Sequence, residues 1–307
     1  MTATTSMTPE QSASLKSIWE EQNKWSQAAD RLKQQVQTAR LGTAILSLLG
    51  AFLATLASVL AQMNGGTWQV IIAAAGAVCL AIAPLILRAG ATAEHIKTWT
   101  RTRAAAEALN AQIYRFLAGG PPYGSERPPD LLLHQRDEVV DGFKDIIPII
   151  AIQVKALPEL LTIDGYIDQR VQGQEKYFVD NAIKHKQRAD RFNNIVLILT
   201  WIAAVLGAIT AYLGQWAPLI GPWVAVMTTA GAAVAAHAAA ERYAILATTY
   251  SATAGRLKSL REAFSIDKNR NAPERIEQFI SDCEDALSAE NGGWMAEWSR
   301  EPSQGQT

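Results

Sequence analysis

Charged residues are missing from two long stretches of this sequence. No Asp, Glu, Lys or Arg occurs between Arg40 and Arg88 or between Arg191 and Glu241, although such residues make up 19% of the chain. A bilayer core about 30 Å thick is crossed by roughly 20 apolar residues in a helix, so each stretch is long enough for two crossings. Neither stretch alternates with a period of two, and lipid offers backbone groups no partners. We therefore expect helices rather than strands.

Each apolar stretch is divided by a short segment that predicts a hairpin turn, at residues 62–67 and 214–222. Trp68, Trp216 and Trp223 stand at these turns, where interfacial aromatic residues are expected. The four predicted spans cover about residues 42–61, 68–87, 194–213 and 223–240. The pattern predicts an all-α membrane protein in which two helical hairpins cross the bilayer.

Basic residues next to the spans lie at the outer ends of the hairpins, and both turns are free of charge. By the positive-inside rule, both termini and the middle segment are then cytoplasmic, and the protein is a multi-pass protein of a cell inner membrane. The outer ends carry Lys33, Arg40, Arg88, Lys97, Arg101, Lys184, Lys186, Arg188, Arg191 and Arg242. The alternative is a soluble helical protein or a colicin-like insertion domain that buries two hairpins. The same asymmetry in both stretches favours the membrane.

The sequence repeats its organisation after 151 residues. This offset aligns Arg40 with Arg191 and Trp99 with Tyr250, and it superimposes the two apolar stretches without a gap. Duplication of a two-span unit, flanked by long amphipathic cytoplasmic helices, would produce this pattern. The predicted organisation is a first unit at 1–130, a linker region at 131–160, a second unit at 161–301 and a disordered tail at 302–307.

Two segments near the boundary between the repeats are compatible with more than one structure. Residues 119–130, GGPPYGSERPPD, hold too much glycine and proline for a helix and predict a linker or an ordered loop. Residues 146–154, IIPIIAIQV, are too short to span a bilayer. They predict a strand, a buried helix turn or an interfacial segment, and the sequence does not choose among these.

Outside the spans, apolar residues recur at intervals of three and four, as in helices that pack through one face. These stripes comprise Leu15, Ile18, Gln22, Trp25, Ala29, Leu32 and Val36; Ile96, Trp99, Arg103, Ala106, Leu109 and Ile113; and Tyr250, Ala254, Leu257 and Phe264. A last amphipathic helix is predicted from near Pro273, with Ile276, Phe279, Ile280 and Leu287 buried. We expect the helices of each repeat to pack together, and docking of a partner is the alternative.

Small residues spaced by three or four line one face of several spans. Such faces let helices approach closely, and their hydroxyl groups are suited to line a polar path between assembled chains. The candidate pore or helix-packing residues are Thr43, Ser47, Gly50, Ala54, Ser58, Thr200, Ala204, Gly207, Ala211, Gly231 and Ala235. Packing within a hairpin is the simpler use of these residues. A pore would require a homo-oligomer.

Motifs for catalysis, cofactors or metals are not found in the sequence. It contains no phosphate-binding glycine loop, no H-E-x-x-H and no G-x-S-x-G, and its four histidines are not at ligand spacing. Cys79 and Cys283 predict free thiols. The net charge of −1 argues against nucleic acid as a partner. His237 is the only Asp, Glu, Lys, Arg or His side chain within a span, which disfavours an ion-coupled transporter.

The second repeat resembles the SLATT family, the SMODS- and SLOG-associating two-TM effectors. The resemblance rests on YIDQRVQGQEKYF at residues 166–178, in which the family-like motif residues are Tyr166, Arg170, Gln174 and Tyr177. It extends to ERYAILATTYSATAGRLKSL at residues 241–260. The first repeat resembles a sister type of the same family through the helix around Trp99.

This resemblance implies a function that the residue pattern alone does not. SLATT proteins are thought to be bacterial membrane effectors that form pores or disturb the membrane when a nucleotide-linked sensor is triggered, as in phage defence. The resemblance implies no enzyme activity and no cofactor, and it implies a separately encoded nucleotide-sensing partner. The rival interpretation is a membrane-anchored scaffold or sensor that presents its cytoplasmic helices to a partner.

Overall fold

The computed structural model describes residues 7–63, 66–151, 153 and 155–299, with side chains up to residue 289. Its α-helices are α1 Pro9–Gln62, α2 Gly66–Gly90, α3 Ala93–Ala118, α4 Pro129–Asp141, α5 Ile163–Tyr166, α6 Gly173–Tyr212, α7 Ala217–Ala240, α8 Tyr243–Ile266 and α9 Pro273–Ser299. Shorter turns are η1 Lys144–Ile146, η2 Ile167–Gln172 and η3 Gly214–Trp216. Within these residues there is no strand, and the predicted all-α class is confirmed.

The chain divides into two compact units, and each takes residues from both halves of the sequence. The membrane unit comprises residues 34–92 and 183–247. The head unit comprises the described residues of 1–33, 93–182 and 248–307. The predicted disordered tail lies outside the described residues. This spatial division separates apolar hairpins from charged helices, whereas the repeat in the sequence separates one hairpin from the other.

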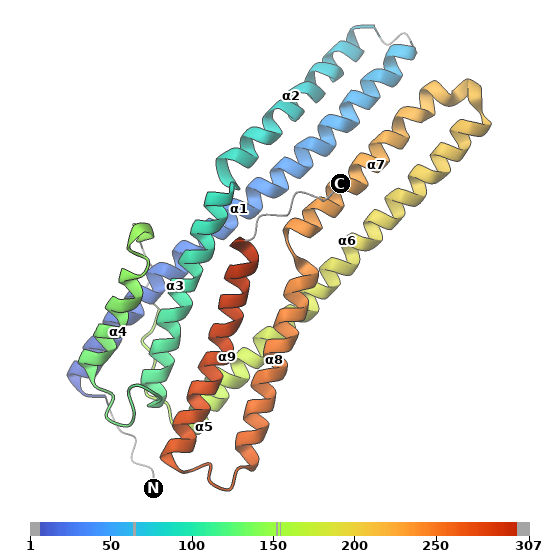
Figure 1. Cartoon of the computed structure of the whole chain (residues 1–307). Coiled ribbons are helices and arrows are strands. Elements are labelled where there is room, and N and C mark those ends of the chain that lie inside the picture. The colour runs from blue at the N-terminus through green and yellow to red at the C-terminus, as the bar shows by residue number, and fades with distance from the viewer. Residues whose placement is uncertain (1–6, 64–65, 152, 154, 300–307) are drawn as a thin grey trace. The chain divides into compact units, whose positions relative to one another are not determined.

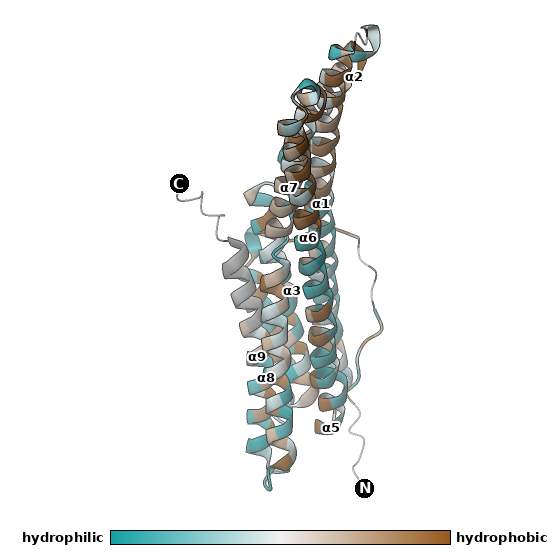
Figure 2. Ribbon diagram, turned by 90° about the vertical axis from the view of Figure 1, so that its right-hand side faces the viewer, coloured by the Kyte–Doolittle hydropathy of each residue, from teal (hydrophilic) through white to brown (hydrophobic). Residues whose placement is uncertain are grey.

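Four helices of the membrane unit are long and apolar enough to cross a bilayer. Figure 2 shows their hydrophobic residues gathered along α1, α2, α6 and α7. Large apolar side chains project outward; Ile45, Val70, Leu85, Leu197 and Trp201 are each more than half exposed. Soluble proteins rarely expose large contiguous apolar patches to water. The chain is therefore an integral membrane protein.

The second hairpin turn is shorter than predicted. Helix α7 begins at Ala217 rather than near residue 223, because proline at the start of a helix needs no N–H partner. Pro222, inside the helix, has no N–H to donate to the carbonyl of Pro218. Gln62 supplies the missing donor, and its Nε2 donates to the Pro218 oxygen at 2.9 Å.

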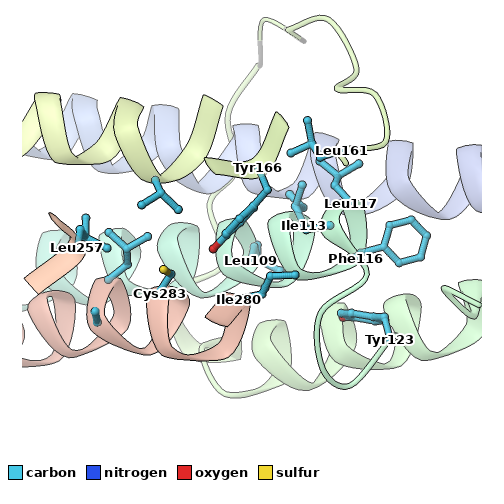
Figure 3. Packing of buried hydrophobic residues seen from close by; sticks show 14 of the residues in the cluster. Leu109, Ile113, Phe116, Leu117, Tyr123, Leu161, Tyr166, Leu257, Ile280 and Cys283 are labelled. Atoms are coloured by element: carbon cyan, nitrogen blue, oxygen red, sulfur yellow. The ribbon is translucent and has the colours of Figure 1, made fainter. Parts of the chain in front are cut away.

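The head unit buries the stripes that the sequence predicted. Trp25, Leu109, Leu257 and Ile280, from α1, α3, α8 and α9, are completely buried in one cluster, part of which is drawn in Figure 3. Each such side chain contributes about 1.5–3 kcal/mol by leaving water. Helices of both repeats share this core, so packing is not confined to the helices of one repeat.

The segment at residues 119–130 is an ordered loop. Gly119 has a φ of +69°, a conformation that favours glycine. Arg127 Nε donates to the Phe116 carbonyl at 2.9 Å, which ties the loop to the end of α3. Tyr123 is 3% exposed and lies in the head-unit core. The buried ring and the hydrogen bond hold the loop against the helices.

The segment after η1 is extended and has no regular secondary structure among its described residues. Side chains of α1 hold its backbone. Gln27 donates to the Gln153 carbonyl at 2.8 Å and accepts from the Gln153 N–H at 3.1 Å. Trp19 Nε1 donates to the Lys155 carbonyl at 3.0 Å. Of the predicted alternatives, neither a strand nor a helix turn forms there, and residues 152 and 154 lie outside the description.

Candidate functional site

Two glycines bring the helices of the first hairpin close together. A Cβ added to Gly50 would lie 2.6 Å from Leu80 Cγ and 3.1 Å from the Gly76 carbonyl oxygen. A Cβ added to Gly76 would lie 3.1 Å from both the Ala54 nitrogen and the Gly50 oxygen. Only glycine fits such a backbone approach without displacement. The structure thus places Gly50 at the contact between α1 and α2.

The small residues of α1 that were predicted to line a pore are only partly available to one. Thr43 Oγ1 contacts the Ala39 carbonyl at 2.8 Å and the Ala83 carbonyl at 3.1 Å, within the first hairpin. Ser47 is partly buried, whereas Ala54 and Ser58 are exposed. The four residues therefore differ in surroundings although they share a face of the helix.

The small residues of the second hairpin leave more space. A Cβ added to Gly207 would have no neighbour within 4 Å, and one added to Gly231 would meet Leu199 Cβ at an ordinary 3.9 Å. Thr200 donates to the Val196 carbonyl of its own helix. The exposed members of the predicted face are Thr200, Ala204 and Ala211 on α6 and Ala235 on α7. Close packing of α6 through Gly207 is thus not present within one chain.

The two hairpins contact each other through α1 and α7, and Figure 1 shows α1 between α2 and α7. The rings of Phe52 and Trp223 lie 5.4 Å apart between centroids. At the base of α7, Arg40 Nη1 lies 3.5 Å from Glu241 Oε1 and donates to the Ala240 carbonyl at 3.1 Å. Glu241 is 7% exposed, so this ion pair is shielded from water.

The family-like motif lies in the head unit, where its first two residues form a buried network with Glu284 of α9. Arg170 Nε and Nη2 donate to the two oxygens of the Glu284 carboxylate at 3.0 and 2.9 Å. Tyr166 Oη donates to Glu284 Oε1 at 2.9 Å. The Arg170 guanidinium also lies over the Tyr114 ring, 4.2 Å from its centroid. Two charges and a phenol thus satisfy one another away from water.

Electrostatics within this network follow from its burial. Arg170 is 4% exposed and Glu284 is completely buried. Burial acts to lower the pKa of Arg170, but the Glu284 carboxylate overcomes this effect and holds the pKa above its usual value. Burial, together with the Glu284 charge, raises the pKa of Tyr166. The Arg170 guanidinium therefore stays charged, and Tyr166 stays protonated as a donor to the Glu284 carboxylate.

The last two motif residues, Gln174 and Tyr177, line a pocket of about 180 Å³ beside Arg170. Residues of α1, α3, α8 and α9 complete its wall. Tyr166 ends α5, Arg170 lies in η2, and Gln174 and Tyr177 lie near the start of α6. Their spacing of four, four and three residues is typical of one helix face. The structure therefore brings the motif together: Tyr166 and Arg170 form the ion-pair network, and Arg170, Gln174 and Tyr177 line the pocket.

Sequence reasoning missed Glu284, although a signal was present. Glu284 falls within the apolar stripe of α9, between Ile280 and Leu287, where a charged residue is out of place. Such a carboxylate requires a buried cation as its partner. Among the described residues, no group of three or more His, Cys, Asp or Glu side chains is placed to hold a metal ion.

Residues 166–294 match the family described as "SMODS and SLOG-associating 2TM effector domain 1", and the match begins at the first motif residue. Residues 166–294 are therefore similar to a SLATT domain. Residues 23–130 match a different family, described as "Protein of unknown function (DUF4231)". No curated protein matches the chain. No solved structure matches it either. The predicted resemblance to the SLATT family is confirmed.

The matched segment, residues 166–294, contains the complete Tyr166–Arg170–Glu284 network and the hairpin of α6 and α7. It does not contain its whole core. Leu109 and Ile113 of α3 lie outside the match and are buried in the same cluster as Tyr166, as Figure 3 shows. The matched segment therefore packs against helices of the preceding half in the head unit.

Proposed function

We propose that this protein is a non-enzymatic membrane effector that makes the bilayer permeable when several copies assemble. The family that residues 166–294 match is described as an effector domain. The observation that carries the proposal is the open small-residue face of α6, where a Cβ added to Gly207 would have no neighbour within 4 Å in a single chain. By family resemblance, the setting is a bacterial conflict or anti-phage system, with a separately encoded nucleotide-sensing protein as the trigger.

Assembly is proposed because the two apolar stretches of one chain hold no Asp, Glu, Lys or Arg to line a polar path. Ions cross hydrocarbon only where water or polar groups line a route. Thr43, on the first hairpin, already contacts backbone carbonyls of that hairpin. Copies that meet along the face of Thr200, Ala204 and Gly207 would bring small residues and hydroxyl groups between helices. The van der Waals packing of small faces supplies the attraction in lipid, where apolar burial gives little.

A flux measurement tests this proposal. Purified protein is reconstituted in liposomes that contain a self-quenching anionic dye, with the trigger protein added where required. Gly207→Leu should abolish dye release because a large side chain forces the α6 helices apart. Ala208→Leu is the matched control: Ala208 is exposed and lies about 100° around the helix from Gly207. Equal release from the two variants would refute assembly through Gly207.

The second candidate function is a membrane-anchored scaffold or sensor. The pocket beside Arg170 favours it, since an effector that only inserts into lipid needs no pocket in its head unit. Under this alternative, liposomes that carry the triggered protein stay tight, and triggered cells keep their membrane potential. Dye release by the wild-type protein would exclude a purely anchoring role.

A further inference from the structure

The pocket of the head unit has aromatic walls. The rings of Phe178 and Tyr250 form an edge contact with their centroids 5.3 Å apart. The ring centroids of Tyr177 and Tyr250 are 6.4 Å apart. Trp99 of α3 also belongs to the lining and is 5% exposed. The volume of about 180 Å³ is close to that of an engineered cavity that holds a single benzene ring. The walls and the volume suit one planar ring system.

Hydrogen-bond donors without partners also line this pocket. Arg103 Nη2 lies 2.5 Å from Glu107 Oε1, which holds the guanidinium in place. The other nitrogens of Arg103 have no protein acceptor among the described residues, nor does the Gln174 amide. Lys33, at the exposed end of the lining, has no ion-pair partner there either. A guanidinium, an ammonium and an amide therefore face the pocket with donors to spare.

The remaining charges of the lining leave these donors available. Arg170 is neutralised by Glu284 in a two-point ion pair and takes no further charge. Asp30 is the one lining carboxylate besides Glu107, and it is exposed. The spare donors thus outnumber the spare acceptors. An oxyanion is the group that a guanidinium and an ammonium bind most strongly together.

We propose that this pocket binds a small molecule that joins one planar aromatic ring to one carboxylate or phosphate group. The ring lies among Trp99, Tyr177 and Tyr250, and the anionic group meets Arg103, Gln174 and Lys33. The site lies within the head unit, so the proposal holds whether or not the hairpins form a pore. Two sources share this chemistry, an aromatic carboxylate and a nucleoside monophosphate.

Binding is measured by saturation-transfer NMR on the full chain in nanodiscs, with empty nanodiscs to subtract partitioning into lipid. The probes are indole-3-acetate and 5′-AMP, each beside its uncharged counterpart, indole-3-acetamide or adenosine. At least one anion should bind about tenfold or more tightly than its uncharged counterpart. The tighter of the two anions identifies the source.

Variants separate this site from general attraction to the protein. Arg103→Met should reduce anion affinity about tenfold, to that of the uncharged probe. Lys16→Met is the control, because Lys16 is an exposed cation of α1 outside the lining. If Arg103→Met fails to fold, Gln174→Leu, which removes no protein hydrogen bond, should still weaken binding several-fold. The proposal is overturned if neither anion binds above empty nanodiscs at millimolar concentration. Unchanged affinity in both variants would overturn it equally.

Discussion

At the scale of single residues, the stability of the head unit depends on the buried carboxylate of Glu284. It is completely buried and accepts three hydrogen bonds from two side chains, one of them a cation. An ion pair of this kind adds little net stability compared with apolar residues of similar volume. Removing one partner is different, because the other charge is left without compensation in the core.

Glu284→Ala should destabilise the head unit by about 3–5 kcal/mol, since it leaves the Arg170 charge buried and unpaired. The double variant Arg170→Met/Glu284→Leu should recover most of this loss, because no charge then remains. Thermal unfolding of the full chain, followed by circular dichroism, measures both effects. Glu262→Ala, which removes an exposed carboxylate from α8, is the control. Equal melting of Glu284→Ala and Glu262→Ala would contradict the role of the network.

At the scale of helices, the two hairpins use their small residues differently. Gly50 and Gly76 allow α1 and α2 to approach until side chains and backbone are within contact distance. Gly207 and Gly231 hold no such contact within the chain. The same residue type at similar spacing thus closes one hairpin and leaves a face of the other open.

Gly50→Ala should lower the melting temperature, because the new Cβ meets Leu80 and the Gly76 carbonyl and forces a shift that costs about 1–3 kcal/mol. Gly207→Ala should leave melting unchanged or raise it, because the new Cβ meets nothing and alanine favours a helix by about 1 kcal/mol. Melting in detergent micelles compares the two variants. A larger loss for Gly207→Ala would show that the close helix contact lies at α6 instead.

At the scale of the whole molecule, the orientation in the membrane follows from charge and remains a prediction. Basic residues flank the outer ends of the hairpins, and both turns lack charge. Moving guanidinium and ammonium groups across the bilayer is costly, which retains such flanks in the cytoplasm. The head unit and both termini would then be cytoplasmic.

Cysteine labelling of whole cells tests this orientation. In a Cys79→Ser, Cys283→Ser background, Gln215→Cys at the second turn should react with a membrane-impermeant thiol reagent, and Ser125→Cys in the head unit should not. The other position predicted to label, Asn64, lies outside the described residues. Labelling confined to Ser125→Cys would reverse the topology. Labelling of permeabilised cells is the control, because it shows that each thiol reacts once the reagent can reach it.

The sequence by itself determined the features that depend on local pattern. The two stretches without charged residues predicted four apolar helices, because segments of that length and composition are stable in lipid rather than in water. Trp25, Leu109 and Leu257 were predicted as packed because helical periodicity puts them on one face. The motif from Tyr166 to Tyr177 pointed to the SLATT family before any contact was known.

Only the tertiary structure decided how these parts are used. The partner of Arg170 is 114 residues away at Glu284, and periodicity within one helix carries no information on which helix lies opposite. Periodicity also predicted the same role for Gly50 and Gly207. A Cβ added to Gly50 would meet α2, whereas one added to Gly207 would meet nothing within 4 Å. The pocket joins five helices, so its combination of rings and donors exists only after folding. Contacts between distant segments depend on global packing, which a local pattern does not encode.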